Sequence, residues 1–177
     1  MQDTARPTAH LVLGGARSGK SRHAEALVRA MPGPWIYVAT AEARDDEMAE
    51  RIARHRQERG PQWHTVEAPR ALAEAIETAP EGAPVLVDCL TLWLTNVMLA
   101  DEDVEAACRQ LVETVASRRR PLVLVANEVG FGIVPDNALA RRFRDHAGLL
   151  NQRLAAVVDE VILMVAGLPL TVKGPTQ

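Results

Sequence analysis

One stretch of the chain has residue types and spacing suited to holding a phosphate chain. Gly14, Gly19, Lys20 and Ser21 occupy the fixed positions of the pattern G-x-x-x-x-G-K-[ST]. Glycines let backbone N–H groups turn toward a phosphate, where a Cβ would obstruct them, and the lysine adds positive charge for the β- and γ-phosphates. The hydroxyl of Ser21 suits Mg²⁺. This phosphate-binding loop (P-loop) therefore predicts a nucleoside triphosphate site.

A second stretch carries a candidate nucleophile. Residues 45–59 are expected to form a helix with acids in its first turn, and His55 lies on its apolar face. Arg51 and Arg59 flank His55 about one helical turn away on each side. Their charge suits a triphosphate and disfavours the imidazolium, so the ring stays neutral and nucleophilic. Such a ring could attack an α-phosphorus and expel pyrophosphate. The alternative is a histidine packed on an amphipathic helix.

These groups need elements that bring them together. Residues 10–13 form a short apolar run typical of a buried strand, and residues 20–30 have the apolar stripe of a helix whose N-terminus favours an anion. The order of strand, loop and helix argues against a chance glycine turn. Further strands are expected at 35–39, 63–67, 84–88, 121–126, 159–165 and 167–172, and further helices at 70–78, 91–99, 104–118 and 138–157. Alternating strands and helices predict one doubly wound α/β domain over residues 1–177, with a mainly parallel sheet and helices on both faces.

Polar residues follow several of these strands, where open α/β sheets bind ligands. Thr40, Ala41 and Glu42 follow the second strand, and Asp88 ends the strand at 84–88. In P-loop proteins such an acid commonly lies near Mg²⁺, although it could instead cap the next helix. The segment 127–135 begins Asn-Glu-Val-Gly, which lacks the N-K-x-D pattern of Ras-type GTPases and weakens that interpretation.

The composition excludes some classes of partner. A net charge of −3 and a hydrophobic fraction of 47 % give no indication of a general nucleic-acid or membrane surface. No signal core and no run of membrane-spanning length is present, so we expect a cytoplasmic protein. Cys89 and Cys108 lack metal-ligand spacing, and we expect buried or half-buried thiols in a reducing compartment. We interpret the basic run 118–120 as a solvated helix end without function.

Taken together, the motifs resemble the bifunctional adenosylcobinamide kinase / adenosylcobinamide-phosphate guanylyltransferase family of cobalamin biosynthesis. They extend over nearly the whole chain. The residues that carry the resemblance are Gly14–Arg22, Asp46–Met48, Arg51, Ile52, His55, Trp63, Thr65, Glu67, Asn127–Gly130, Gly132–Pro135, Arg141, Phe143–Asp145, Gly148, Asn151 and Gln152.

The resemblance implies a RecA-like P-loop fold and two reactions. A hydroxyl of adenosylcobinamide takes the γ-phosphoryl group of GTP or ATP, and the resulting phosphate then takes GMP from a guanylylated His55. It also implies Mg²⁺ at Ser21 and Asp88, a homo-oligomer with a trimer as one candidate state, and no nucleic acid or membrane insertion. The implied nucleotide-binding residues are Gly14, Gly15, Ala16, Arg17, Ser18, Gly19, Lys20, Ser21, Thr40, Ala41, Glu42, Arg56, Gln57, Glu58, Arg59, Glu67 and Asp88.

Two other functions remain compatible with the residues alone. One is a P-loop kinase for another small molecule, in which His55 is structural. The other is a nucleotide-gated binding or assembly module of RecA-like form. Only a guanylyltransferase retains the α-phosphate of GTP on the protein, so α-labelled and γ-labelled GTP separate it from the other kinase. A nucleotide-gated module predicts slow hydrolysis at most and no transfer to a corrinoid.

Overall fold

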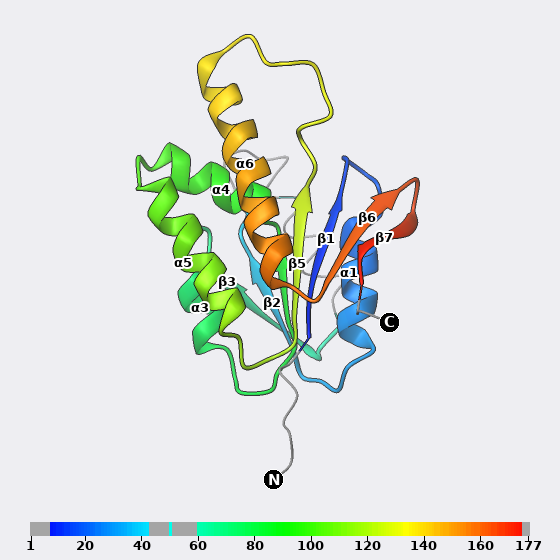
Figure 1. Ribbon diagram of the computed structural model, residues 1–177. Helices are drawn as coiled ribbons and strands as arrows, with labels where there is room; N and C mark the ends of the chain where they lie inside the picture. The colour runs from blue at the N-terminus through cyan, green and yellow to red at the C-terminus, as the bar shows by residue number, and fades with distance from the viewer. Residues whose placement is uncertain (1–7, 43–49, 51–59, 175–177) are drawn as a thin grey trace.

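The computed structural model describes residues 8–42, 50 and 60–174, which form a seven-stranded sheet with the order β3-β2-β4-β5-β1-β6-β7 (Figure 1). Neighbouring strands pair in parallel except β6 and β7, which pair antiparallel. The strands are β1 (Ala9–Gly14), β2 (Trp35–Ala39), β3 (Trp63–Glu67), β4 (Val85–Asp88), β5 (Leu122–Asn127), β6 (Glu160–Val165) and β7 (Leu168–Lys173). The predicted α/β P-loop fold is confirmed.

Helices cover both faces of the sheet, as expected. They are α1 (Lys20–Arg29), α3 (Leu72–Thr78), α4 (Leu90–Leu99), α5 (Val104–Ala116) and α6 (Ala138–Val157). Helix α1 packs on one face with Val12, Leu86 and Val123, whereas α3 to α6 pack on the other with residues such as Leu11 and Leu124. Because both faces are covered, the central strands read as continuous apolar runs rather than alternating ones.

The predicted bounds of these elements agree with the structure to within two residues. The helix from Ala138 to Val157 agrees with the prediction at both ends. Its N-terminal end is defined by Asn137, which caps it by accepting a hydrogen bond from the Ala140 N–H at 2.7 Å. Cys89 and Cys108 are free and buried, as expected. The predicted helix 45–59 lies outside the described residues, apart from Glu50. Across the described part of the chain, no helix is long and apolar enough to cross a membrane.

The prediction of a solvated basic run at residues 118–120 is wrong for two of its three arginines. Arg119 is exposed, but Arg118 and Arg120 are buried. Arg120 donates hydrogen bonds to the carbonyls of Ile76 and Glu77, at the end of α3. A helix leaves its last carbonyls without partners in its own backbone, and a guanidinium can satisfy several at once.

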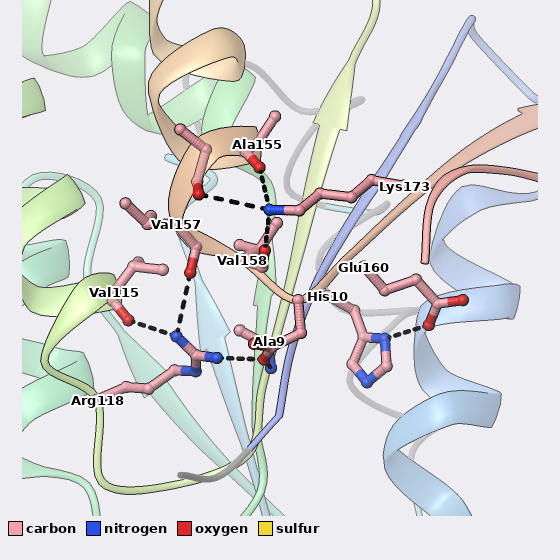
Figure 2. Close-up of polar contacts among 11 residues, drawn as sticks. Ala9, His10, Val115, Arg118, Ala155, Val157, Val158, Glu160 and Lys173 are labelled. Carbon is pink, nitrogen blue, oxygen red and sulfur yellow. Dashed lines mark hydrogen bonds and ion pairs between the residues drawn. The ribbon is translucent and has the colours of Figure 1, made fainter. Parts of the chain in front are cut away.

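Arg118 joins three elements at the amino edge of the sheet, opposite the P-loop (Figure 2). Its guanidinium donates to the carbonyls of Val115 at 3.0 Å and Val157 at 3.4 Å, and it forms an ion pair with Asp159. The same Asp159 oxygen accepts the Ala9 N–H at 2.7 Å. This arginine thus ties the ends of α5 and α6 to the start of β1.

We expect Arg118→Ala to destabilise the fold and Arg119→Ala to leave it nearly unchanged. The Arg118 side chain is 0 % exposed while that of Asp159 is 36 % exposed. Removing the Arg118 guanidinium leaves the carbonyls of Val115 and Val157 without this donor, while water can reach the carboxylate of Asp159. We therefore expect the free energy of unfolding to fall by about 2–3 kcal/mol. The change corresponds to a fall of about 5–10 °C in Tm. Thermal unfolding of both variants checks it; equal melting temperatures would contradict this role.

Candidate functional site

The strand register brings the predicted site residues to one edge of the sheet. Gly14 pairs with Asn127, and Ala39 pairs with both Glu67 and Asp88. The carboxyl ends of β1, β2, β3, β4 and β5 therefore meet at the edge where α/β sheets bind ligands. The loop from Gly14 to Ser21 lies at this edge between β1 and α1 (Figure 1).

The P-loop backbone is held closely by its neighbours. A Cβ at Gly14 would lie 2.7 Å from the carbonyl oxygen of Met164, so only glycine fits there without a shift. Gly19 has φ +93° at the start of α1, a left-handed conformation that favours glycine. The carbonyl of Ser18 accepts the Gly167 N–H at 3.1 Å, and that of Gly14 accepts the Glu128 N–H at 3.0 Å.

Lys20 is placed inside this loop. It is only 7 % exposed, and its Nζ donates to the carbonyl of Gly15 at 2.6 Å. Burial lowers the pKa of Lys20, and negative charge on Cys89 and Asp88 would oppose that shift. Burial and the Asp88 charge raise the pKa of the Cys89 thiol, so the thiol is neutral at neutral pH. The ammonium is thus already oriented in the loop.

Two oxygen donors fit the Mg²⁺ that the sequence predicts. Asp88, half-buried at the end of β4, supplies a carboxylate, and Ser21 supplies a hydroxyl at the start of α1. The hydroxyl of Ser18 is buried and has no hydrogen-bond partner within the described residues. In that same part of the chain, no group of three or more His, Cys, Asp or Glu residues could hold a metal alone. Mg²⁺ bound here would take its other ligands from phosphates and water, as it commonly does.

The predicted site residues after β2 and at the end of β3 differ in exposure. Thr40 is fully buried, Ala41 and Glu42 are half-buried, and Glu67 is exposed. Glu42 lines an open hollow of about 430 Å³ together with Arg70 and residues of α4 and its C-terminal end. The predicted nucleophile and its neighbours, residues 55–59, lie outside the described residues, so their roles stay predictions.

Three residues that hydrogen-bond to residues at the carboxyl edge of the sheet were not identified from the sequence. Tyr37 donates a hydrogen bond to Asp88, Asn96 donates to the carbonyl of Thr40, and the hydroxyl of Thr91 accepts the Asn127 N–H. Asn96 could have been identified from the sequence, because its amide lies within the otherwise largely apolar helix α4. A buried amide needs hydrogen-bond partners and so marks a structural connection.

The comparisons with known proteins extend over nearly the whole chain. The model of the family described as cobinamide kinase / cobinamide phosphate guanyltransferase matches residues 10–172. The chain belongs to this family. The bifunctional adenosylcobalamin biosynthesis protein CobP of Pseudomonas aeruginosa is 46 % identical over 167 residues, which cover 93 % of this chain and 96 % of CobP. CobU of Salmonella typhimurium, which carries the same description, is 47 % identical over 180 residues, covering 92 % and 98 %.

Solved structures of low sequence identity share the fold of this cobinamide kinase / guanyltransferase family member. A protein from Pyrococcus horikoshii OT3 superposes with a TM-score of 0.56 at 12 % identity, covering 97 % of this chain and 89 % of its own. An ATPase from the type III secretion system of pathogenic bacteria gives a TM-score of 0.53 at 13 % identity, covering 88 % and 50 %. These likenesses support the P-loop fold alone; the family match is what favours transferase chemistry.

Proposed function

We propose that this chain, as one domain over residues 1–177, is an adenosylcobinamide kinase and adenosylcobinamide-phosphate guanylyltransferase. The observation that carries the proposal is the family match over residues 10–172, joined to a P-loop that already holds Lys20 in place. The relatives named bifunctional adenosylcobalamin biosynthesis proteins are about as long as this chain and cover it almost entirely.

In the kinase step, the hydroxyl oxygen of adenosylcobinamide attacks the γ-phosphorus of GTP or ATP. The bond to the β-phosphate oxygen breaks, the nucleoside diphosphate leaves and the hydroxyl proton is released. Lys20 and the loop amides compensate the phosphate charge, which is the main requirement of phosphoryl transfer. Mg²⁺, held by Ser21 and Asp88, would supply further charge neutralisation when bound.

In the guanylyltransferase step, a ring nitrogen of His55 attacks the α-phosphorus of GTP and pyrophosphate leaves. A phosphate oxygen of adenosylcobinamide phosphate then attacks the same phosphorus, which frees His55 and yields adenosylcobinamide-GDP. Covalent catalysis of this kind divides one difficult displacement into two easier ones. The proposed nucleotide-binding set consists of the P-loop together with Thr40, Ala41, Glu42, Arg56, Gln57, Glu58, Arg59, Glu67 and Asp88.

We also propose that the protein is a cytoplasmic homo-oligomer, with a trimer as the candidate state. The cytoplasm supplies GTP and ATP, and the free Cys89 and Cys108 suit a reducing compartment. Apolar side chains lie exposed in the segment after β5 and on β7, notably Phe131, Ile133 and Leu168. Exposed apolar patches commonly mark contact surfaces. Light scattering during gel filtration would give the number of subunits, and a monomer would contradict this part of the proposal.

Two labelled forms of GTP test the proposed reactions. With adenosylcobinamide as acceptor, γ-labelled GTP should give labelled adenosylcobinamide phosphate, and α-labelled GTP should give labelled protein and then adenosylcobinamide-GDP. A kinase for another small molecule would give neither product from this acceptor. A nucleotide-gated module would show slow hydrolysis at most, and either result would overturn the proposal.

A further inference from the structure

Asp88 is held by a side chain from the neighbouring strand. The hydroxyl of Tyr37 on β2 donates a hydrogen bond to Oδ2 of Asp88 on β4, at 3.3 Å. Tyr37 pairs with Leu86, so Asp88 lies two residues further along β4 in a diagonal position that an aromatic side chain can reach. Tyr37 and Leu86 pack in the core on the α1 face of the sheet, the face from which Lys20 approaches.

The ring of Tyr37 has little freedom to move. Tyr37 is 6 % exposed, and its ring packs edge-on against Trp63 with the centroids 6.1 Å apart. The phenol therefore presents its hydroxyl to Asp88 from a fixed position. A hydroxyl bonded to one carboxylate oxygen leaves the other oxygen available to a further ligand.

The backbone that follows Asp88 is held by Thr40, the residue after the end of β2. The hydroxyl of Thr40, which is fully buried, donates to the carbonyl of Cys89 at 2.7 Å and accepts the Cys89 N–H at 2.8 Å. Thr40 is itself anchored by Asn96, whose amide donates to the Thr40 carbonyl at 2.8 Å and to the Pro69 carbonyl at 3.0 Å. The Thr40 hydroxyl thus fixes the backbone of Cys89, the residue next to Asp88.

We propose that Tyr37 and Thr40 are positioning residues that fix the carboxylate of Asp88 for the Mg²⁺ of a bound Mg²⁺–triphosphate. Tyr37 orients the carboxylate group, and Thr40 fixes the backbone that carries it. The inference rests on the proposed function, which places Mg²⁺ at Asp88 and Ser21. Neither positioning residue touches the reacting atoms; their effect is on metal affinity, as for other groups that hydrogen-bond to a ligating carboxylate.

Tyr37→Phe tests this with little disturbance, because it removes the hydroxyl and keeps the ring. The measurement is the Mg²⁺ concentration that gives half-maximal binding of a fluorescent, non-hydrolysable GTP analogue to the purified protein. We expect this concentration to rise about 10-fold in the variant. Binding of the analogue in EDTA and the Tm should stay close to those of the wild type, which a purely structural role would not predict.

Trp35→Phe is the matched control. Trp35 lies two residues away on β2, and its Nε1 donates to the Met31 carbonyl at 2.9 Å, so the change also removes one aromatic hydrogen-bond donor from this strand. We expect an unchanged Mg²⁺ titration. A second pair of variants, Thr40→Val and Thr40→Ser, tests the role of the Thr40 hydroxyl. Valine removes the hydroxyl, whereas serine keeps it. We therefore expect Thr40→Val to raise the half-saturating Mg²⁺ concentration more than Thr40→Ser.

The outcomes separate this inference from the proposed function. If the wild type binds the analogue in a Mg²⁺-dependent way and Tyr37→Phe gives the same titration, the positioning role is overturned and the proposed function stands. If the wild type shows no Mg²⁺-dependent binding, the positioning role is overturned, whereas the proposed function is overturned only by the absence of the labelled products described above. A Trp35→Phe shift as large as that of Tyr37→Phe would also count against a specific role for the hydroxyl.

Discussion

Lys20→Ala is expected to lower both the kinase and the guanylyltransferase activity by about 10²–10³-fold, because both reactions use a triphosphate held by the same loop. Lys20 is buried, and its Nζ lies 2.6 Å from the Gly15 carbonyl, so the ammonium lies within the loop that is proposed to bind the phosphates. Alanine keeps the backbone of the loop and removes this charge. Initial rates with γ-labelled and α-labelled GTP measure the two losses separately.

Lys173 is the other lysine of the chain and makes a matched control. Its ammonium donates to the carbonyls of Ala155, Ala156 and Val158 at the end of α6 (Figure 2). We expect Lys173→Ala to keep both activities and to lose about 1–2 kcal/mol in the free energy of unfolding. Full activity of Lys20→Ala in either reaction would contradict a shared triphosphate site.

His55→Ala is expected to abolish acid-labile labelling of the protein by α-labelled GTP while part of the kinase activity survives. The imidazole is the proposed nucleophile of the guanylyl step alone, whereas the kinase step transfers the γ-phosphoryl group directly to the acceptor. Removing a covalent nucleophile commonly costs several orders of magnitude, so we expect guanylyltransferase activity to fall at least about 10³-fold.

His64→Ala controls for the loss of a histidine. His64 is exposed on β3 and lies outside the proposed nucleotide-binding set. We expect this variant to be labelled like the wild type. Labelling of His55→Ala at the wild-type level would show that another residue carries the guanylyl group and would remove His55 from the mechanism.

Local patterns allowed most of the fold to be predicted. The P-loop is recognisable because its glycines, lysine and serine act at fixed spacing, and the start of α6 is predicted because Asn137 is a side-chain cap. Contacts between distant residues were not predictable in this way. Tyr37 and Asp88 meet because β2 lies next to β4, and that strand order cannot be deduced from either segment alone.

The arginines at 118–120 illustrate the same limit. A basic run after a helix is normally solvated, and Arg119 follows that rule. Arg118 and Arg120 depart from it because carbonyls of Val157 and Ile76, far away in sequence, lie within reach of their guanidinium groups. A buried cation is tolerated where such acceptors converge on it. The site residues around His55 were assigned by resemblance, and they remain predictions.

A pulse–chase with labelled GTP tests the central claim most directly. The wild-type protein is incubated with α-labelled GTP and Mg²⁺, freed of nucleotide, and then mixed with adenosylcobinamide phosphate. We predict that acid-labile label on the protein disappears as labelled adenosylcobinamide-GDP forms in equal amount. Protein that never acquires α-label, or label that stays on the protein when the acceptor is added, would contradict the proposed guanylyltransferase.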